Sequence, residues 1–313
     1  MTDIAIGKPI KERFMQSERV KIYEYSGKVG MMGMGWIFMF VFGIFSLSLS
    51  MIYVLATYYI PFVYLNFLLT VCFGGVCGYA VALGGKLGKV RNVTLYLTIG
   101  LLIGILAEYC QWVAWVYVHS GYKDWIFAPN GLYNFISAVA VDGFWTMFGV
   151  AVKGKLLYAI WLIEGVIIIL CAPSGAYGYL FSTPFCEECN KWFKTRENLN
   201  IMPLDTIVAP AVIRNHLLAG DCSTLLDLNI KNSRGDSYTK LKISSCPKCD
   251  KFHILSVYVV SVICDEDGED EHESPVIENL MLTLPMFQSI TNRYLYQNEI
   301  SPTVGSPLQT VYA

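Results

Sequence analysis

The sequence predicts an α-helical polytopic membrane domain, with four transmembrane helices and one re-entrant or interfacial helix, followed by a small α+β soluble domain. Three observations support this fold class. The 313-residue chain is 54% hydrophobic and 15% charged, and its apolar residues are concentrated in residues 34–173. Two Cys-x-x-Cys pairs follow in a more polar C-terminal half. Residues 1–173 hold 12 Lys/Arg and 8 Asp/Glu (net +4), whereas residues 174–313 hold 11 and 17 (net −6).

Four segments are apolar for long enough to cross about 30 Å of hydrocarbon as helices. A turn at Pro61 joins the first to the second, and charged residues separate the second from the third. The first segment is longer than the apolar core of a signal peptide, so we expect it to remain as a span. The predicted parts are an N-terminal cytosolic segment (1–33), the membrane domain (34–173, with spans 34–59, 62–85, 93–119 and 156–173), a soluble domain (174–300) and a disordered tail (301–313).

The distribution of basic residues predicts the orientation of these spans. Six Lys or Arg residues precede the first span, and three more lie in residues 86–91 between the second and third. The loop at 120–130 has one Lys, which an Asp balances. By the positive-inside rule, both termini are cytosolic and membrane lipid surrounds the spans. Cysteines scattered along the chain suit a reducing cytosol, and we expect a bacterial inner membrane.

Residues 131–152 are apolar but interrupted by Asn134 and Asp142. We interpret this segment as a re-entrant or interfacial helix on the outer side of the membrane. The alternative is a fifth span, which would place the soluble domain outside. Lys153 and Lys155 would then be cytosolic, which the positive-inside rule also accepts.

Polar and ionisable residues in or beside the spans are candidates for function. Glu108 and Glu164 lie near the middles of the third and fourth spans, where an unpaired charge is costly. Gln111 and His119 share one helical stripe with Glu108, and Asp142 lies in the intervening segment. These side chains are candidates to line a polar pocket for a lipid headgroup, a proton or a small polar ligand. The alternative is that they hydrogen-bond neighbouring helices and contribute only to packing.

The two Cys-x-x-Cys pairs predict a metal site. Four thiolates in two such pairs are the usual ligands of one tetrahedral Zn²⁺ ion. Alternating residues 238–243 and β-branched residues 252–264 predict strands on either side of the second pair. The predicted ligands are Cys186, Cys189, Cys246 and Cys249.

This strand–turn–strand pattern resembles the knuckle hairpin of zinc-ribbon domains, over residues 186–189 and 238–264 only. The resemblance implies one structural Zn²⁺ per chain and brings no partner or activity with it. The gap between the pairs, 56 residues at 190–245, departs from the roughly 15–20 residues of compact four-cysteine sites. A predicted helix at 208–226 occupies this insertion. Disulfides, redox-active dithiols or an iron site are the alternatives to zinc.

The rest of the soluble domain carries an excess of negative charge. Residues 265–273 form an acidic run without the ligand spacing of a calcium loop, so we interpret it as a solvated hairpin tip. Docking of a basic partner is the alternative. We expect residues 276–297 to return as a strand and a helix. The acidic balance argues against nucleic acid as a ligand, because phosphate contacts need clustered Lys and Arg.

The sequence has no His-Glu-x-x-His, Walker loop, Gly-x-Ser-x-Gly or dinucleotide fingerprint, so no enzymatic activity is predicted. It predicts instead an adaptor, scaffold or sensor in which membrane spans anchor a zinc-stabilised module that binds a protein partner. One alternative is a membrane thiol–disulfide oxidoreductase that uses the two cysteine pairs. Another is a small channel or lipid-binding protein with an intramembrane pocket.

Gly-x-x-x-Gly motifs in the second span favour close packing within one chain, with a homo-oligomer as the alternative.

Overall fold

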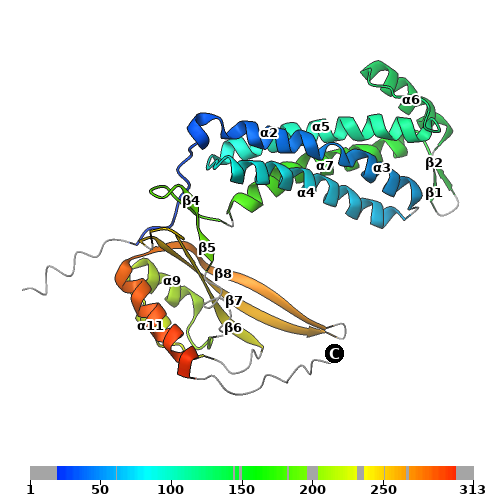
Figure 1. The fold of residues 1–313 in the computed structure, drawn as a ribbon. Coiled ribbons are helices and arrows are strands. Elements are labelled where there is room, and N and C mark those ends of the chain that lie inside the picture. The colour runs from blue at the N-terminus through cyan, green and yellow to red at the C-terminus, as the bar shows by residue number, and fades with distance from the viewer. Residues whose placement is uncertain are drawn as a thin grey trace, which may run out of the picture. The chain divides into compact units, whose positions relative to one another are not determined.

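The computed structural model describes residues 20–60, 62–143, 145–147, 150–181, 183–195, 204–230, 236–249, 251–265 and 268–300. The chain forms two compact units (Figure 1). The helical unit spans Tyr25–Thr183. The sheet unit combines Met1–Glu24 with Pro184–Ala313. The predicted tail at 301–313 lies outside the described residues.

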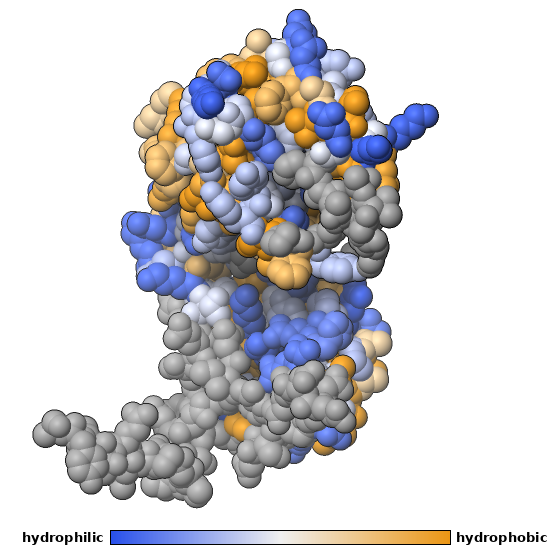
Figure 2. Space-filling view, turned by 90° about the vertical axis from the view of Figure 1, so that its right-hand side faces the viewer, coloured by the Kyte–Doolittle hydropathy of each residue, from blue (hydrophilic) through white to orange (hydrophobic). Residues whose placement is uncertain are grey.

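Among its described residues, the helical unit has four stretches that are long and apolar enough to cross a membrane. They comprise the helices α2 (Gly35–Ser46) and α3 (Leu49–Tyr59), which together make the first, and α4 (Val63–Leu87), α5 (Val93–His119) and α7 (Lys155–Phe181). The predicted span at 93–119 matches α5 residue for residue, because the Asn92 side chain accepts from the Leu95 N–H (3.0 Å) and caps its first turn. In the upper part of Figure 2, apolar residues lie along the flanks of this unit and hydrophilic ones at the end that faces the viewer.

The first predicted span, 34–59, is broken between α2 and α3 at Leu47 and Ser48. The hydroxyls of Ser46 and Ser48 each donate to the carbonyl three residues back, at 2.6 and 2.9 Å. The N–H groups of Leu47 and Ser48 also bond three residues back. Serine hydroxyls that compete for main-chain carbonyls tighten and bend a helix. The apolar run alone did not predict this break.

The fourth helix is longer than the predicted span 156–173, because α7 continues through Pro173 to Phe181. Pro173 has no N–H for the Ile169 carbonyl. Two glycines of α5 face this point: a Cβ added at Gly104 would lie 3.0 Å from the Ile169 oxygen, and one at Gly100 would lie 2.7 Å from Pro173 Cα. The backbone of α5 therefore packs closely against α7 at the proline, and α7 continues past it.

The described part of residues 131–152 contains no helix long enough for the fifth span that the sequence left open. They form most of a short helix, α6 (Pro129–Asp142), and a small hairpin of β1 (Trp145–Met147) and β2 (Val150–Val152). Gly143, at φ +85°, ends the helix in a conformation that favours glycine. The 14 residues of α6 extend only about 21 Å, less than the hydrocarbon thickness.

The sheet unit contains a four-stranded antiparallel sheet in the order β5-β6-β7-β8. A separate two-stranded hairpin, β3 with β4, precedes it. The elements are β3 (Phe185–Cys186), β4 (Lys191–Trp192), β5 (Lys194–Thr195), α9 (Pro210–Leu218), α10 (Ser223–Leu226), β6 (Ser237–Ser245), β7 (His253–Asp265), β8 (Gly268–Leu282) and α11 (Leu284–Ile300).

The predicted strands at 238–243 and 252–264 correspond to β6 and β7, and the strand and helix expected within 276–297 to β8 and α11. One expectation was wrong. The helix at 208–226 is two helices, α9 and α10, because Gly220 turns the chain at φ +83°. The acidic run lies at the end of the β7–β8 hairpin, as expected, but it also extends along β8, where Glu273 is opposite Val260.

The sheet carries a separate core on each face. On one face, α9, α10 and α11 cover the helix-side core, which includes Leu255, Val257 and Leu280. On the other, Ile254 joins the metal-side core with Phe193 and two of the cysteines. Neighbouring residues of β7 thus point into different cores, as the period-2 alternation of a strand requires.

Candidate metal centre

The two Cys-x-x-Cys pairs lie at the turns of two hairpins. Cys186 ends β3, and the chain returns through Asn190, at φ +54°, to β4. The second pair forms the turn between β6 and β7, where the Cys246 N–H donates to the Phe252 carbonyl (3.3 Å). The short β5 pairs with the end of β6 and so brings the first hairpin to the second across the long insertion.

The four sulfur atoms converge on one point. The Sγ atoms of Cys186, Cys189, Cys246 and Cys249 all lie within 4.8 Å of one another, and those of Cys186 and Cys249 are 3.9 Å apart. A tetrahedral ion with Zn–S bonds of about 2.3 Å separates its sulfurs by about 3.8 Å. A disulfide needs about 2.05 Å, and the four thiols are free. The geometry therefore fits a metal ion held by four thiolates.

Charge also favours a cation at this point. Burial and hydrogen bonds with the neighbouring sulfurs together raise the pKa of the Cys189 thiol to about 12. Burial opposes ionisation of Cys246 too, yet the N–H groups of Lys248 and Cys249 lower its pKa to about 7. The Cys246 thiolate is available near neutral pH, and ionising Cys189 beside it requires a compensating positive charge.

Apolar side chains shield the four sulfurs from water. Cys186 and Cys246 are 2% and 3% exposed, and Phe193 and Ile254 are buried with them. Tyr23 packs against this group from the N-terminal segment, which sequence analysis did not connect with the site. No signal in the sequence links residue 23 to a cysteine pair more than 160 positions later, because an edge contact of this kind leaves no local pattern.

The other potential ligands lie elsewhere. Cys222 packs against the helix-side core, and His272 is exposed on β8. His253 is buried, where its Nδ1 shares a hydrogen bond with the Ser245 hydroxyl (2.9 Å). The side chain of Cys264 lies outside the described residues.

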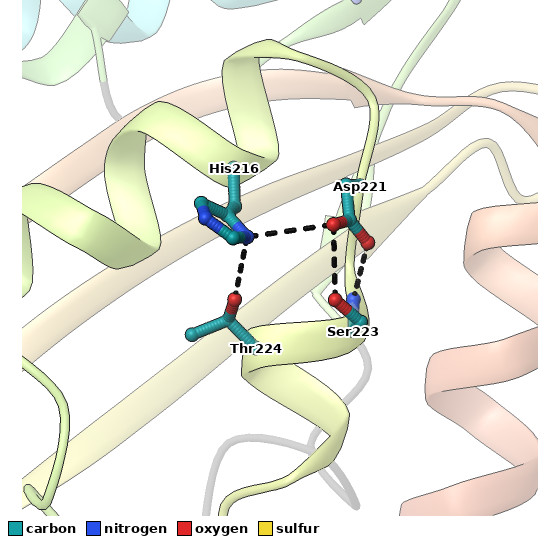
Figure 3. A network of polar contacts seen from close by, with 4 residues as sticks. All are labelled: His216, Asp221, Ser223 and Thr224. Carbon is teal, nitrogen blue, oxygen red and sulfur yellow. Dashed lines mark hydrogen bonds and ion pairs between the residues drawn. The ribbon is translucent and has the colours of Figure 1, made fainter.

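A His–Asp–Ser combination on the helices resembles a catalytic triad only in composition (Figure 3). The Ser223 hydroxyl donates to Asp221 (3.0 Å), not to His216. Thr224 and Asp221 both contact His216 Nδ1, at 2.7 and 3.4 Å, whereas a triad uses the two ring nitrogens separately. The Ser223 N–H also bonds Asp221 (2.8 Å) and lowers the pKa of that carboxyl. The network therefore ties the turn between α9 and α10.

The predicted intramembrane residues are only partly brought together. On α5, Glu108 Oε1 accepts from Trp112 Nε1 (2.7 Å) and Gln111 Nε2 (3.4 Å). Glu108 Oε2 is buried and has no hydrogen-bond partner among the described residues. His119 lies towards the end of α5, where its ring stacks on Trp115 (3.9 Å between centroids).

Glu164 lies on α7 beside the Glu108 carboxyl. A Cβ added to its neighbour Gly165 would be 2.8 Å from Glu108 Oε1. One turn before Glu164, the Trp161 ring meets Trp112 edge-on at 5.2 Å. Asp142 does not join this group within the described contacts: it is exposed at the end of α6, because Gly143 turns the chain there.

No protein-family model matches this chain, and neither a curated protein nor a solved structure matches it. Its function is therefore inferred from its own residues.

Proposed function

We propose that this is an integral membrane adaptor in which four helices anchor a cytosolic module, held together by one structural Zn²⁺ ion, that binds a protein partner. The observation that carries this proposal is the convergence of four sulfurs, from two hairpins separated by a long insertion, to within 4.8 Å. Four thiolates fill a tetrahedral ion completely. Such a closed site stabilises a fold and offers no open position for catalysis.

Two features favour zinc over redox-active cysteine pairs. A dithiol needs only its own partner and an accessible sulfur, whereas here both pairs meet and the first cysteine of each is buried. Iron also accepts four thiolates, but Cys-x-x-Cys knuckles on two hairpins are the usual arrangement for structural zinc.

The N-terminal segment supports an even number of spans. Tyr23 N–H donates to the Asn279 carbonyl (2.7 Å), so the residues before the first helix and the domain after the last belong to one unit. If the four apolar stretches cross a membrane, both ends lie on the same side. Lys28 and Arg91 meet at one end of the helical unit, where the Arg91 N–H donates to the Lys28 carbonyl. The positive-inside rule then favours the cytosol.

The partner is inferred from charge. Asp270, Glu271 and Glu273 are exposed on β8, although Glu273 already pairs with Lys240 (2.6 Å). An acidic strand of this kind attracts basic surfaces and speeds their association. We therefore propose a basic protein surface as the partner.

Metal analysis of the detergent-purified chain tests the module. We expect about one zinc per chain, protection of the four cysteines from alkylation until a chelator is added, and loss of zinc in Cys246→Ser. Cys222→Ser is the matched control and should retain zinc, because Cys222 packs in the other core. Metal-free protein with these cysteines in disulfides would refute the zinc module and favour the oxidoreductase alternative.

A second candidate function, binding of a small polar ligand or lipid headgroup between α5 and α7, is favoured by the unpartnered Glu108 Oε2. A buried carboxyl oxygen without a partner is costly, so a bound group that donates to it would be stabilised. Native mass spectrometry of the purified chain tests this by its retained lipids. Glu108→Gln should lose a bound species that Asp142→Asn, an exposed control, keeps. Identical spectra for both variants and the parent would contradict it.

A further inference from the structure

We propose that the metal centre holds residues 20–24, the segment that leads into the first helix. Two chain segments connect the sheet unit to the helices, and metal loading would then determine whether both of them or only one is fixed to the sheet unit. This inference rests on the proposed zinc module. The chain enters the helical unit at Tyr25 and leaves it at Thr183. Only the second connection is fixed by the cysteine hairpins directly, because Phe185 and Cys186 follow it.

The backbone of the N-terminal segment adds a short strand to the sheet. Ile22 lies opposite Leu280 in an antiparallel bridge, with the Tyr23 N–H donating to the Asn279 carbonyl (2.7 Å) and the Met281 N–H to the Lys21 carbonyl (2.9 Å). Two main-chain hydrogen bonds do not offset the conformational entropy lost by ordering these five residues. The segment therefore depends on its side chains to stay in place.

Tyr23 supplies the connection to the metal centre. Its ring packs against the metal-side core, which includes Cys186 and Cys246. Its hydroxyl accepts from the Phe185 N–H (3.1 Å) and donates to the Phe185 carbonyl (3.3 Å), so it holds the residue next to Cys186 from both sides. At the other end of the segment, Val20 packs against the helix-side core.

The element that holds Tyr23 depends on the metal. Strands β3 and β4 have two residues each, and isolated hairpins of that length are not stable. Without an ion, the four sulfurs no longer tie this hairpin to β6 and β7. The hydroxyl of Tyr23 then loses its fixed partner, and the segment is released. By linkage, the segment must favour metal binding by the same factor that metal favours the segment.

Trypsin offers a direct measurement on the full-length, detergent-purified chain. The Lys21 side chain is exposed, but its carbonyl is bonded within the sheet, and proteases cleave only chains that open. We expect chelation to raise the cleavage rate after Lys21 by about 30-fold, which corresponds to the loss of roughly two net hydrogen bonds. Cleavage after Lys28, whose carbonyl bonds Arg91 in the helical unit, should not change.

Tyr23→Phe removes only the hydroxyl, and Tyr64→Phe, at an exposed position of the helical unit, is the matched control. With zinc bound, Tyr23→Phe should be cut faster after Lys21 and should lose zinc to a chelator several-fold faster, whereas Tyr64→Phe should match the parent. The coupling would be overturned if Tyr23→Phe behaved like the parent in both assays. It would also be overturned if zinc removal left the cleavage rate after Lys21 unchanged, a result that would not count against the zinc module itself. Equal acceleration at Lys240 in β6 would mean that the whole unit unfolds and would refute selective release. Purified protein without zinc would instead refute the proposed function.

Discussion

Replacing Gly78 by alanine should destabilise the helical unit, because α4 and α7 touch there through their backbones. A Cβ at Gly78 would lie 2.0 Å from the Ala172 oxygen and 2.9 Å from the Ala176 nitrogen. Relief requires α4 and α7 to separate by about 1.4 Å, since non-bonded contacts begin near 3.4 Å. No side-chain rotation can supply this, so the cost lies near the upper end of the overpacking range, about 3 kcal/mol. The better helix propensity of alanine returns about 1 kcal/mol.

Gly75→Ala is the matched control on the same helix. A Cβ at Gly75 meets nothing within 4 Å, so this variant gains the same propensity without the clash. The two variants should therefore differ by about 3 kcal/mol in free energy of unfolding. Loss of helical circular dichroism, as the denaturing detergent fraction rises in mixed micelles, measures this difference. Equal stability of the two variants would refute the close packing of α4 on α7.

Two further predictions concern the sheet unit. Tyr294→Phe should lower its free energy of unfolding by about 1–3 kcal/mol, measured by chemical denaturation, because the buried hydroxyl donates to the Leu225 carbonyl and lies 3.3 Å from that of Leu228. An unchanged midpoint would contradict that role. Asp221→Ala should cost about 0.5 kcal/mol at pH 7, a low value because the side chain is half exposed. Hydrogen bonds from Ser223 hold the pKa of Asp221 below its ordinary value, so its contribution is present above pH about 4 and is lost as the pH falls further. A difference that persisted in acid would contradict this assignment.

The sequence predicted the long helices well where a local signal marks their ends. Asn92 caps α5, and the predicted bounds were correct there. Prediction failed where tertiary contacts override the local signal. Pro173 would end a solvent-exposed helix, but glycines at positions 100 and 104 of α5 allow a neighbour to pack around it. The break at Leu47 was not predicted for a different reason. The apolar run gives no sign that the hydroxyls of Ser46 and Ser48 bond to main-chain carbonyls within the helix.

The convergence of the four cysteines was predicted from the sequence, but their surroundings were not. Cysteine spacing identifies four sulfurs without any knowledge of the fold, and the sulfurs do converge. The structure explains why the gap between the two cysteine pairs is long. The insertion contains α9 and α10, which cover the face of the sheet opposite to the cysteines. Tyr23 could not be predicted, because an edge contact from a distant segment has no periodicity in the sequence.

The two cores of the sheet unit differ in what they need. The helix-side core has 17 buried residues among those described, including Leu255 and Ile290, which is enough apolar surface to hold a sheet and its helices without help. The metal-side core has four, and two of these are Cys186 and Cys246. The proposed ion would therefore stabilise one face of the sheet only. Removal of the ion should loosen β3, β4 and the N-terminal segment, while β6 to β8 remain packed beneath α11. The reason is that Ile254 and Leu255, neighbours on β7, belong to different cores, one stabilised by the proposed ion and the other by apolar burial.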